Sequence, residues 1–342
     1  MIGSSSGSPA CSHGSRLRRP VLARFPLLCL LSCLFTGLLA APAASGMEVR
    51  RPGDQRSVLA PLADRSLLLA GVLAGQRLVA VGERGHVLLS DDGGRTFQQV
   101  EVPTRTTLTA VSFPDARRGW AAGHDQVILR TSDGGEQWEQ VYADPGDERP
   151  VLDLWFRDGL HGYAVGAYGL FLETGDGGAT WTSRRISEDD FHLNRLAPAG
   201  GDRLYLAAEA GMVYRSEDAG HTWVALDSPY EGSYFGILWL SGDTLLLYGL
   251  RGHLFRSEDG GESWQTLASG TEASLTDGVA LADGRVVLVG MGGALLVSDD
   301  GGRSFSPHDR EDRTGIAAVV QVPDGGLVTL GEAGARRVSD VP

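Results

Sequence analysis

Residues 90–97 read Ser-Asp-Asp-Gly-Gly-Arg-Thr-Phe, and the same pattern, Ser/Thr-x-Asp-Gly-Gly-x-Thr/Ser-Trp/Phe, recurs five more times along the chain. Two copies deviate, with Ala219 in place of the first glycine and Gln137 in place of the second hydroxyl residue. The aspartates of successive copies are 41, 43, 42, 41 and 41 residues apart. Each copy therefore belongs to one structural repeat. The other five copies begin at Thr131, Thr174, Ser216, Ser257 and Ser298.

Each repeat contains four short strand patterns. In the second repeat, the alternation of apolar and polar residues and the turn residues between them predict strands over residues 108–113, 119–122, 127–131 and 137–141. No helical periodicity competes with this pattern. Four short antiparallel strands in a repeat of this length form one blade of a β-propeller, so the fold is predicted to be all-β.

A Gly-x-x-Gly turn before the third strand gives the number of blades. It is visible at residues 82–85, 166–169, 249–252 and 290–293, and once more at 331–334, with residues 331–339 aligning with 290–298. Glycine allows the positive φ that such a turn needs. We therefore predict seven blades of four antiparallel strands, with six as the alternative. Because the seventh repeat stops before its outer strand, residues 55–60 are expected to close that blade as an N-terminal strand.

The first 44 residues have the features of a secretory signal peptide. They contain four arginines and no acidic residue, followed by an apolar run over residues 25–40 and small residues over 41–44. A twin-arginine-like pair and a lipobox-like Leu-Leu-Ser-Cys ending at Cys33 are weaker signals, since the apolar run continues beyond Cys33. We predict cleavage and a periplasmic protein, with an uncleaved anchor as the alternative. Residues 45–66 then supply the closing strand, and residues 67–342 form the propeller.

Composition excludes several kinds of site. All three cysteines lie within residues 1–44, so the rest of the chain has no thiol for a disulfide, a metal site or a nucleophile. Residues 45–342 contain 26 basic and 43 acidic residues, a formal charge of −17, which argues against nucleic-acid binding. The histidines are scattered over different repeats without ligand-like spacing. We predict no metal site and no cofactor.

The repeated aspartates are predicted to be structural. In a turn between the third and fourth strands, each carboxylate is expected to accept hydrogen bonds from the N–H groups of the following glycines. The hydroxyl residue adds a further bond, and the Trp or Phe packs between blades. Single carboxylates on separate blades cannot chelate one ion. The six residues are Asp92, Asp133, Asp176, Asp218, Asp259 and Asp300.

The octapeptide resembles the Asp box, or bacterial neuraminidase (BNR) repeat, of sialidases and other propellers. The longer stretch over residues 80–94, echoed over 164–178, resembles the repeat of the photosystem II stability/assembly factor family. That resemblance covers roughly residues 57–342. It implies an exported seven-bladed propeller that binds membrane-protein segments and chlorophyll-protein intermediates and catalyses nothing. In a bacterium without photosynthesis, the partner would be another membrane assembly, such as an exporter.

Binding residues are expected on the face opposite the Asp boxes. Strand alternation places the Gly-x-x-Gly turns and the loops between blades there. Arginine offers paired donors for a carboxylate and tyrosine a stiff contact area, so peptide carboxylates or acidic head groups are the expected ligands. The candidates are Arg84, Asp125, Tyr168 and Arg251 at turn tips and Arg105, Arg149, Arg184 and Arg185 in the loops between blades.

The predicted function is that of a non-catalytic scaffold, monomeric and at most peripheral to the membrane, for assembly or stability of a membrane-protein complex. Two alternatives stay open: a glycoside hydrolase of the sialidase type and a lectin-like module that binds glycans or the cell envelope. The Arg-Ile/Leu-Pro motif usual near the start of a sialidase domain is absent. For other glycosidases, Asp189 and Asp190 are the only adjacent acidic pair on the expected face, and sequence neighbours point to opposite sides of a strand.

Overall fold

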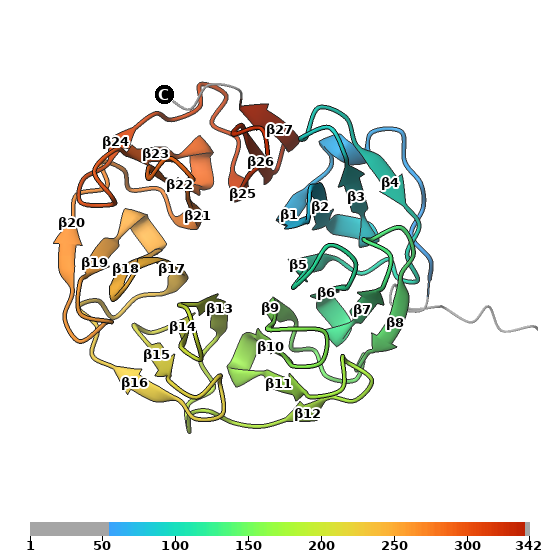
Figure 1. The fold of residues 1–342 in the computed structure, drawn as a ribbon, viewed down its shortest axis with the longest axis horizontal. Helices are drawn as coiled ribbons and strands as arrows, with labels where there is room; N and C mark the ends of the chain where they lie inside the picture. The colour runs from blue at the N-terminus through green and yellow to red at the C-terminus, as the bar shows by residue number, and fades with distance from the viewer. Residues whose placement is uncertain (1–54, 339–342) are drawn as a thin grey trace, which may run out of the picture. The chain divides into compact units, whose positions relative to one another are not determined.

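Seven antiparallel sheets follow one another around a common axis in the computed structural model, which describes residues 55–338 (Figure 1). Sheets 1 to 6 have four strands each and sheet 7 has three. In every sheet the strands follow chain order from the axis to the rim, so each sheet is one blade. The prediction of a seven-bladed propeller is confirmed. The predicted signal peptide and residues 45–54 lie outside the described residues.

The strands of the first three blades have the following bounds. Blade 1 contains β1 (Leu68–Ala74), β2 (Arg77–Gly82), β3 (Val87–Ser90) and β4 (Gln98–Val100). Blade 2 contains β5 (Leu108–Ser112), β6 (Gly119–Gly123), β7 (Ile128–Thr131) and β8 (Glu139–Tyr142). Blade 3 contains β9 (Val151–Phe156), β10 (Gly162–Gly166), β11 (Phe171–Thr174) and β12 (Thr182–Ser183).

The remaining blades continue the series. Blade 4 contains β13 (Leu193–Pro198), β14 (Leu204–Ala208), β15 (Val213–Ser216) and β16 (Val224–Leu226). Blade 5 contains β17 (Tyr234–Ser241), β18 (Thr244–Gly249), β19 (Leu254–Ser257) and β20 (Gln265–Leu267). Blade 6 contains β21 (Leu275–Ala280), β22 (Val286–Gly290), β23 (Leu295–Ser298) and β24 (Ser306–Pro307). Blade 7 contains β25 (Ile316–Gln321), β26 (Leu327–Gly331) and β27 (Gly334–Val338).

Burial explains the composition of each strand. The second strand of a blade lies between two neighbouring blades, and every residue of β6, β10 and β14 is buried. Such strands are runs of small and apolar residues without alternation, because both faces are covered. The outer strands β4, β8 and β16 are short and have exposed or half-buried residues. Apolar side chains therefore concentrate between blades.

Seven apolar cores hold the ring together, one between each pair of neighbouring blades. The core between the first and last blades joins Leu68, Leu78 and Leu88 to Val328 and Leu330, all 0–1% exposed. Full burial of one such side chain contributes about 1.5–3 kcal/mol. The ring therefore closes through the same kind of packing that joins its other blades.

The Asp-box turns share one hydrogen-bond network, illustrated by blade 4. The Ser216 hydroxyl is 2.8 Å from Asp218 Oδ1 and accepts a bond from Gly220 N. Asp218 in turn accepts bonds from the backbone N–H and hydroxyl of Thr222, at 2.8 and 2.6 Å. The prediction that the carboxylate accepts hydrogen bonds from the glycine N–H groups is therefore wrong. The buried hydroxyl accepts the Gly220 N–H, and the carboxylate accepts from Thr222. Hydrogen bonds from the Thr222 hydroxyl and N–H lower the pKa of Asp218 to about 2.

Asp-box turns also connect neighbouring blades. The carbonyl of the first glycine position accepts a side-chain bond from the preceding blade: Trp120 Nε1 donates to Gly177 O at 3.0 Å and Tyr205 Oη to Gly260 O at 2.9 Å. Tyr163 Oη donates to Ala219 O in the same way, at 2.8 Å. This explains why alanine is accepted at position 219, since the connection uses only the backbone oxygen.

The prediction that residues 55–60 form the fourth strand of blade 7 is wrong. Ser57 N donates to Val102 O at 2.9 Å, and Val102 N donates to Ser57 Oγ at 2.9 Å. Gln99 accepts from Ala60 N through its side-chain oxygen at 2.7 Å. Residues 55–60 therefore lie beside β4 on the rim of the first blade. Their backbone groups find hydrogen-bond partners there, in particular the Gln99 amide.

Polar contacts also close the ring between the last and first blades. Arg337 on β27 donates to Gly93 O, the first glycine of the first Asp box. The same guanidinium bonds Asp324 at 2.8 Å, and Arg95 reaches Asp324 at 2.9 Å. Blade 7, with three strands among residues 55–338, thus uses the same carbonyl acceptor as the three blade pairs described above.

Candidate functional site

The two faces of the ring carry different turns. Gly134 of an Asp box donates to Arg117 O at 2.8 Å, so the Asp boxes lie with the hairpins between the first and second strands. On the other face, the N–H of Asp144, in a loop between blades, donates to Asp125 O at 3.1 Å. We call this second face the turn face. It carries the Gly-x-x-Gly turns and the loops between blades.

The turns of the first six blades each place two consecutive residues, the tip and the residue after it, at positive φ. Arg84, Asp125, Tyr168 and Arg251 have φ between 52° and 56° at the tips of short 3-10 turns. In blade 1, close packing beneath the tip requires the second glycine, because a Cβ on Gly85 would lie 2.3 Å from Thr104 O. The predicted tip residues are therefore held in a fixed backbone conformation on the turn face.

Three of the predicted residues meet in one pocket around blade 3. Arg149, Tyr168 and Arg185 line a cavity of about 310 Å³ together with Asp189 and Asp190. Tyr168 is 58% exposed. Two guanidinium groups beside an exposed phenol can pair with a carboxylate and cover an apolar or aromatic neighbour.

Local contacts orient the side chains of this pocket, which we call the blade-3 pocket. Arg149 Nε bonds both oxygens of Asp147, at 2.9 and 3.0 Å, and this pairing lowers the pKa of Asp147 to about 2. Arg185 donates to Glu188 O at 2.6 Å. The Tyr168 ring lies against His192 with centroids 4.8 Å apart. The pocket is therefore partly pre-organised.

The other predicted residues are distributed differently. Arg84 and Arg105 meet in a separate pocket beside the N-terminal segment. Asp125, on blade 2, and Arg251, on blade 5, line neither pocket. The eight predicted residues therefore do not form a single binding site.

Arg184 was expected in the loops of the turn face, but the structure places its guanidinium against an Asp box. Its N–H groups donate to the carbonyls of Gly220 and His221 and pair with Glu173 at 3.0 Å. The guanidinium lies 4.7 Å from the centroid of Phe171. The backbone continues its pairing one residue past β12, where Arg184 N bonds Phe171 O, and so directs the side chain between blades 3 and 4. Arg184 is a blade-connecting residue.

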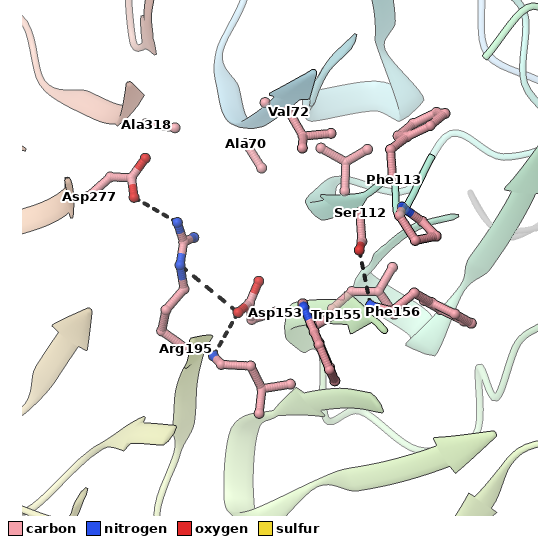
Figure 2. Close-up of a pocket in the computed structure, with 15 residues that line it drawn as sticks. Ala70, Val72, Ser112, Phe113, Asp153, Trp155, Phe156, Arg195, Asp277 and Ala318 are labelled. Atoms are coloured by element: carbon pink, nitrogen blue, oxygen red, sulfur yellow. Dashed lines mark hydrogen bonds and ion pairs between the residues drawn. The ribbon is translucent and has the colours of Figure 1, made fainter. Parts of the chain in front are cut away.

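A charged cluster on the axis was missed by the sequence reasoning. Asp153, Arg195 and Asp277 from blades 3, 4 and 6 line a cavity of about 340 Å³ at the centre of the ring (Figure 2). Arg195 Nη2 is 2.6 Å from Asp277 Oδ1, and its Nε is 4.0 Å from Asp153 Oδ2. We call these three residues the axial cluster.

Both aspartates of the axial cluster also bond the next blade. Leu196 N donates to Asp153 Oδ2 at 2.8 Å and Val319 N to Asp277 Oδ2 at 2.9 Å. The aspartates are 8% and 5% exposed, and burial raises the pKa of Asp153. The nearby aspartates raise the pKa of Arg195 further, so that it stays charged. The cluster ties blades 3, 4, 6 and 7 across the axis, and the described residues contain no group of three or more metal-ligating side chains.

One sequence signal could have identified the axial cluster. In every blade the pairing between the first two strands skips a residue, and the third residue of the inner strand follows that irregularity. Such an irregularity re-aims the side chain. The position holds Ala or Gly in four blades and a charged residue in three, at Asp153, Arg195 and Asp277. The charged residues at this position stand out only when the seven inner strands are aligned with one another.

Comparison with known proteins adds a family match. The model of a family described as "Photosynthesis system II assembly factor YCF48" matches residues 89–151 and 144–342. A Photosystem II assembly lipoprotein Ycf48 from Prochlorococcus marinus is 39% identical over 142 residues. That alignment spans 40% of this chain and 42% of the relative, so it compares about two fifths of each protein.

Solved structures show the same fold. One described as "YCF48 bound to D1 peptide" has a TM-score of 0.67 and 20% identity, and covers 81% of this chain and 94% of that chain. YCF48 from Cyanidioschyzon merolae has a TM-score of 0.65 and 18% identity, with 79% of this chain and 94% of that chain covered. At these identities the likeness establishes the propeller architecture.

Proposed function

We propose, from the premise that this chain belongs to the YCF48 family of photosystem II assembly factors, that it is a scaffold for the assembly or stability of a membrane-protein complex. The blade-3 pocket is the observation that carries this proposal. It offers Arg149, Arg185 and Tyr168 on the turn face, beside loops that a peptide can reach without entering the axis. One relative was solved bound to a D1 peptide, and we assign this chain a ligand of the same class, a segment of a membrane-protein intermediate.

The proposed location is the periplasm or an equivalent lumen. The arginine-rich and apolar residues 1–44 support export, and a relative is named a lipoprotein, which supports a position at the membrane surface. Among the described residues, no helix is long and apolar enough to cross a membrane. We propose a monomer that associates with the membrane peripherally.

The proposed function involves neither catalysis nor nucleic acid. The formal charge of −17 over residues 45–342 disfavours binding to phosphate backbones. Asp189 and Asp190, the pair considered for a glycosidase, line the blade-3 pocket and leave that alternative testable. Purified protein is expected to leave fluorogenic sialosides and other glycosides unhydrolysed. Turnover that depends on Asp189 or Asp190 would contradict the scaffold proposal.

Crosslinking in the native host tests the scaffold directly. The wild-type chain, expressed in that host and purified after crosslinking, is expected to retrieve a membrane protein. The double variant Arg149→Glu/Arg185→Glu is expected to lose it, because two attractive charges become repulsive. Arg117→Glu, an exposed change among the hairpins of the opposite face, is the matched control and is expected to retain the partner. Melting temperatures measured on all three proteins separate lost binding from lost folding. Capture that survives the double variant would remove the blade-3 pocket from the proposal.

A further inference from the structure

A larger pocket on the turn face adjoins the blade-3 pocket and has acidic walls. It has a volume of about 560 Å³ and extends over the turns of blades 3, 4 and 5. The two pockets share Tyr168 and Asp190, so they lie side by side at one turn tip. We call the larger one the blade-4 pocket. Among the described residues that line it there is no arginine, whereas Asp190, Glu209 and Glu231 all contribute to its walls.

A small side chain at the tip of blade 4 leaves this pocket open. Ala210 occupies there the left-handed position that Tyr168 holds in blade 3 and Arg251 in blade 5. The backbone is the same at all three tips, with φ between 52° and 56°. Where the neighbouring blades have a long side chain, blade 4 has a methyl group, and the cavity continues past it to Leu250 of blade 5.

Backbone hydrogen bonds fix the two loops that carry acidic residues into the blade-4 pocket. The second glycine of the blade-3 turn donates to Phe191 O at 2.9 Å, and Gly211 of the blade-4 turn donates to Gly232 O at 2.8 Å. Asp190 and Glu231 each come directly before the accepting residue. They therefore hold equivalent positions in two successive loops, and both line the pocket from a backbone that is tied to a turn.

Two of the three carboxylates in the blade-4 pocket are unpaired. Glu209 Oε2 lies 2.7 Å from His192 Nδ1. Asp190 and Glu231 are exposed, and their carboxylates have no hydrogen-bond or ion-pair partner among the described residues. Exposed acidic residues are common in a chain of this charge, but here they line a cavity that has an exposed tyrosine at its edge. A cation in this cavity gains both ion pairs and a cation–π contact.

We infer that the ligand segment carries a basic side chain close to its carboxylate, and that the blade-4 pocket binds this basic group. Asp190 and Glu231 pair with it, and Tyr168 contacts it at the boundary of the two pockets. The ligand carboxylate lies at Arg149 and Arg185. In an extended peptide, side chains two residues apart point to the same side, so one short segment serves both pockets. The inference rests on the proposed function of the blade-3 pocket and adds the charge pattern of its ligand.

Three capped peptides test the charge pattern, with binding to the purified protein measured by calorimetry. They contain Glu-Gly-Arg, Arg-Gly-Glu or Glu-Gly-Gln between terminal glycines. The better of the two arginine peptides is expected to bind about fivefold more tightly than the glutamine peptide, because it adds an ion pair and a cation–π contact. The order of charges in that peptide gives the direction of the bound segment.

Two protein variants should remove the preference for arginine. In Glu231→Arg an attractive charge becomes repulsive, and Ala210→Arg places in the pocket the side chain that blades 1 and 5 have at their tips. Glu272→Arg is the matched control, because each glutamate directly follows the residue whose carbonyl lies beneath the second turn glycine. It changes the net charge as Glu231→Arg does but lies outside the blade-4 pocket, so the preference is expected to remain. Melting temperatures verify that all three variants are folded.

The outcomes separate this inference from the proposed function. Equal binding of the three peptides to the wild-type protein, no binding at millimolar peptide, or an arginine preference that survives in folded Glu231→Arg and Ala210→Arg overturns the inference. Binding of the glutamine peptide that is lost in Arg149→Glu/Arg185→Glu supports the proposed function even then. Binding of that peptide that survives this double variant contradicts the proposed role of the blade-3 pocket instead.

Discussion

A single buried hydroxyl holds each Asp-box turn in place. In blade 4 the Ser216 side chain accepts a bond from Gly220 N and lies 2.8 Å from the Asp218 carboxylate, while being 1% exposed. The carboxylate, by contrast, lies near the surface and bonds Thr222. Removing the hydroxyl leaves a buried N–H unpaired, whereas the carboxylate lies close to water. The hydroxyl is thus the more sensitive member of the motif.

Ser216→Ala is expected to lower the free energy of unfolding by about 1–3 kcal/mol, the cost of an unsatisfied buried donor. Ser241→Ala, at an exposed strand end, is the control and is expected to change it by less than about 0.5 kcal/mol. Chemical denaturation of both variants provides the measurement. Equal stability of the two would show that the hydroxyl contributes nothing to the turn.

Acid should unfold the protein through the same turns. Hydrogen bonds from the hydroxyl and N–H four residues later lower the pKa of Asp176, Asp218 and Asp259 to about 2. Because the folded pKa lies below the unfolded value of about 3.9, these groups contribute their full stability above about pH 4. That stability is lost as the pH falls toward about 2. Melting temperatures across this range should fall less steeply when the three residues are changed together to asparagine, and an unchanged slope would refute the assignment.

Single residues were predictable where the repeat fixes them. The Gly-x-x-Gly pattern placed Arg84 and Tyr168 at turn tips, and the structure shows both there. Arg184 could not be placed, because one additional backbone bond from its N–H to Phe171 directs the side chain away from the turn face. Such a contact depends on the packing of neighbouring blades and has no signature in the local sequence.

At the scale of elements, the inner strands carry charged side chains that connect different blades across the axis. The axial cluster places Arg195 between two aspartates that also hold the backbone of the next blades. The strands themselves were predictable from period-2 patterns: the predicted range 108–113 is observed as Leu108–Ser112 and 127–131 as Ile128–Thr131. Which strands face each other across the axis depends on the number and order of blades. Ion pairs across the axis can therefore be predicted only when the arrangement of the blades is known.

Arg195→Leu is expected to destabilise the ring by about 2 kcal/mol, because it leaves the buried Asp277 without its ion pair. The cost falls below that of a fully buried pair, since the Arg195 side chain is 36% exposed to the axial cavity. Arg195→Leu/Asp277→Asn should recover part of the loss, as asparagine removes the charge and still accepts from Val319 N. Denaturant midpoints compare the proteins, and a double variant no more stable than the single one would contradict this role.

At the scale of the whole molecule, closure of the ring depends on side chains. Residues 55–60 do not pair with blade 7 as predicted, because residues 57–60 find partners on the rim of blade 1, through Val102 and Gln99. The last and first blades are instead joined by an apolar core and by Arg337. The number of blades could be predicted by counting repeats. The way in which the ring closes could not, because the sequence of a short segment does not determine which blade edge it lies beside.

Arg337→Met should weaken this junction by about 1 kcal/mol through loss of the hydrogen bond to the Gly93 carbonyl, while the exposed ion pair with Asp324 adds little. Amide exchange of β27 and of the first Asp box is then expected to accelerate by about fivefold, while blade 4 stays unchanged. Arg336→Met is the control on the same strand, because Arg336 pairs with Asp312 within the adjoining loop, at 2.8 Å. Mass-spectrometric exchange measures both, and equal acceleration in the two variants would show that the Gly93 contact is not specific to closure.

The left-handed tips have a consequence for how this surface can diverge. At each tip the backbone is fixed, and only the side chain varies: the six positions are Arg84, Asp125, Tyr168, Ala210, Arg251 and Gly292. Branched residues such as valine, isoleucine and threonine are disfavoured there, because their Cβ substituents clash at positive φ. Most other residues fit. A single codon change at a tip can therefore exchange a charge for an aromatic ring without moving the framework, so partner preference can drift between species while the propeller stays the same.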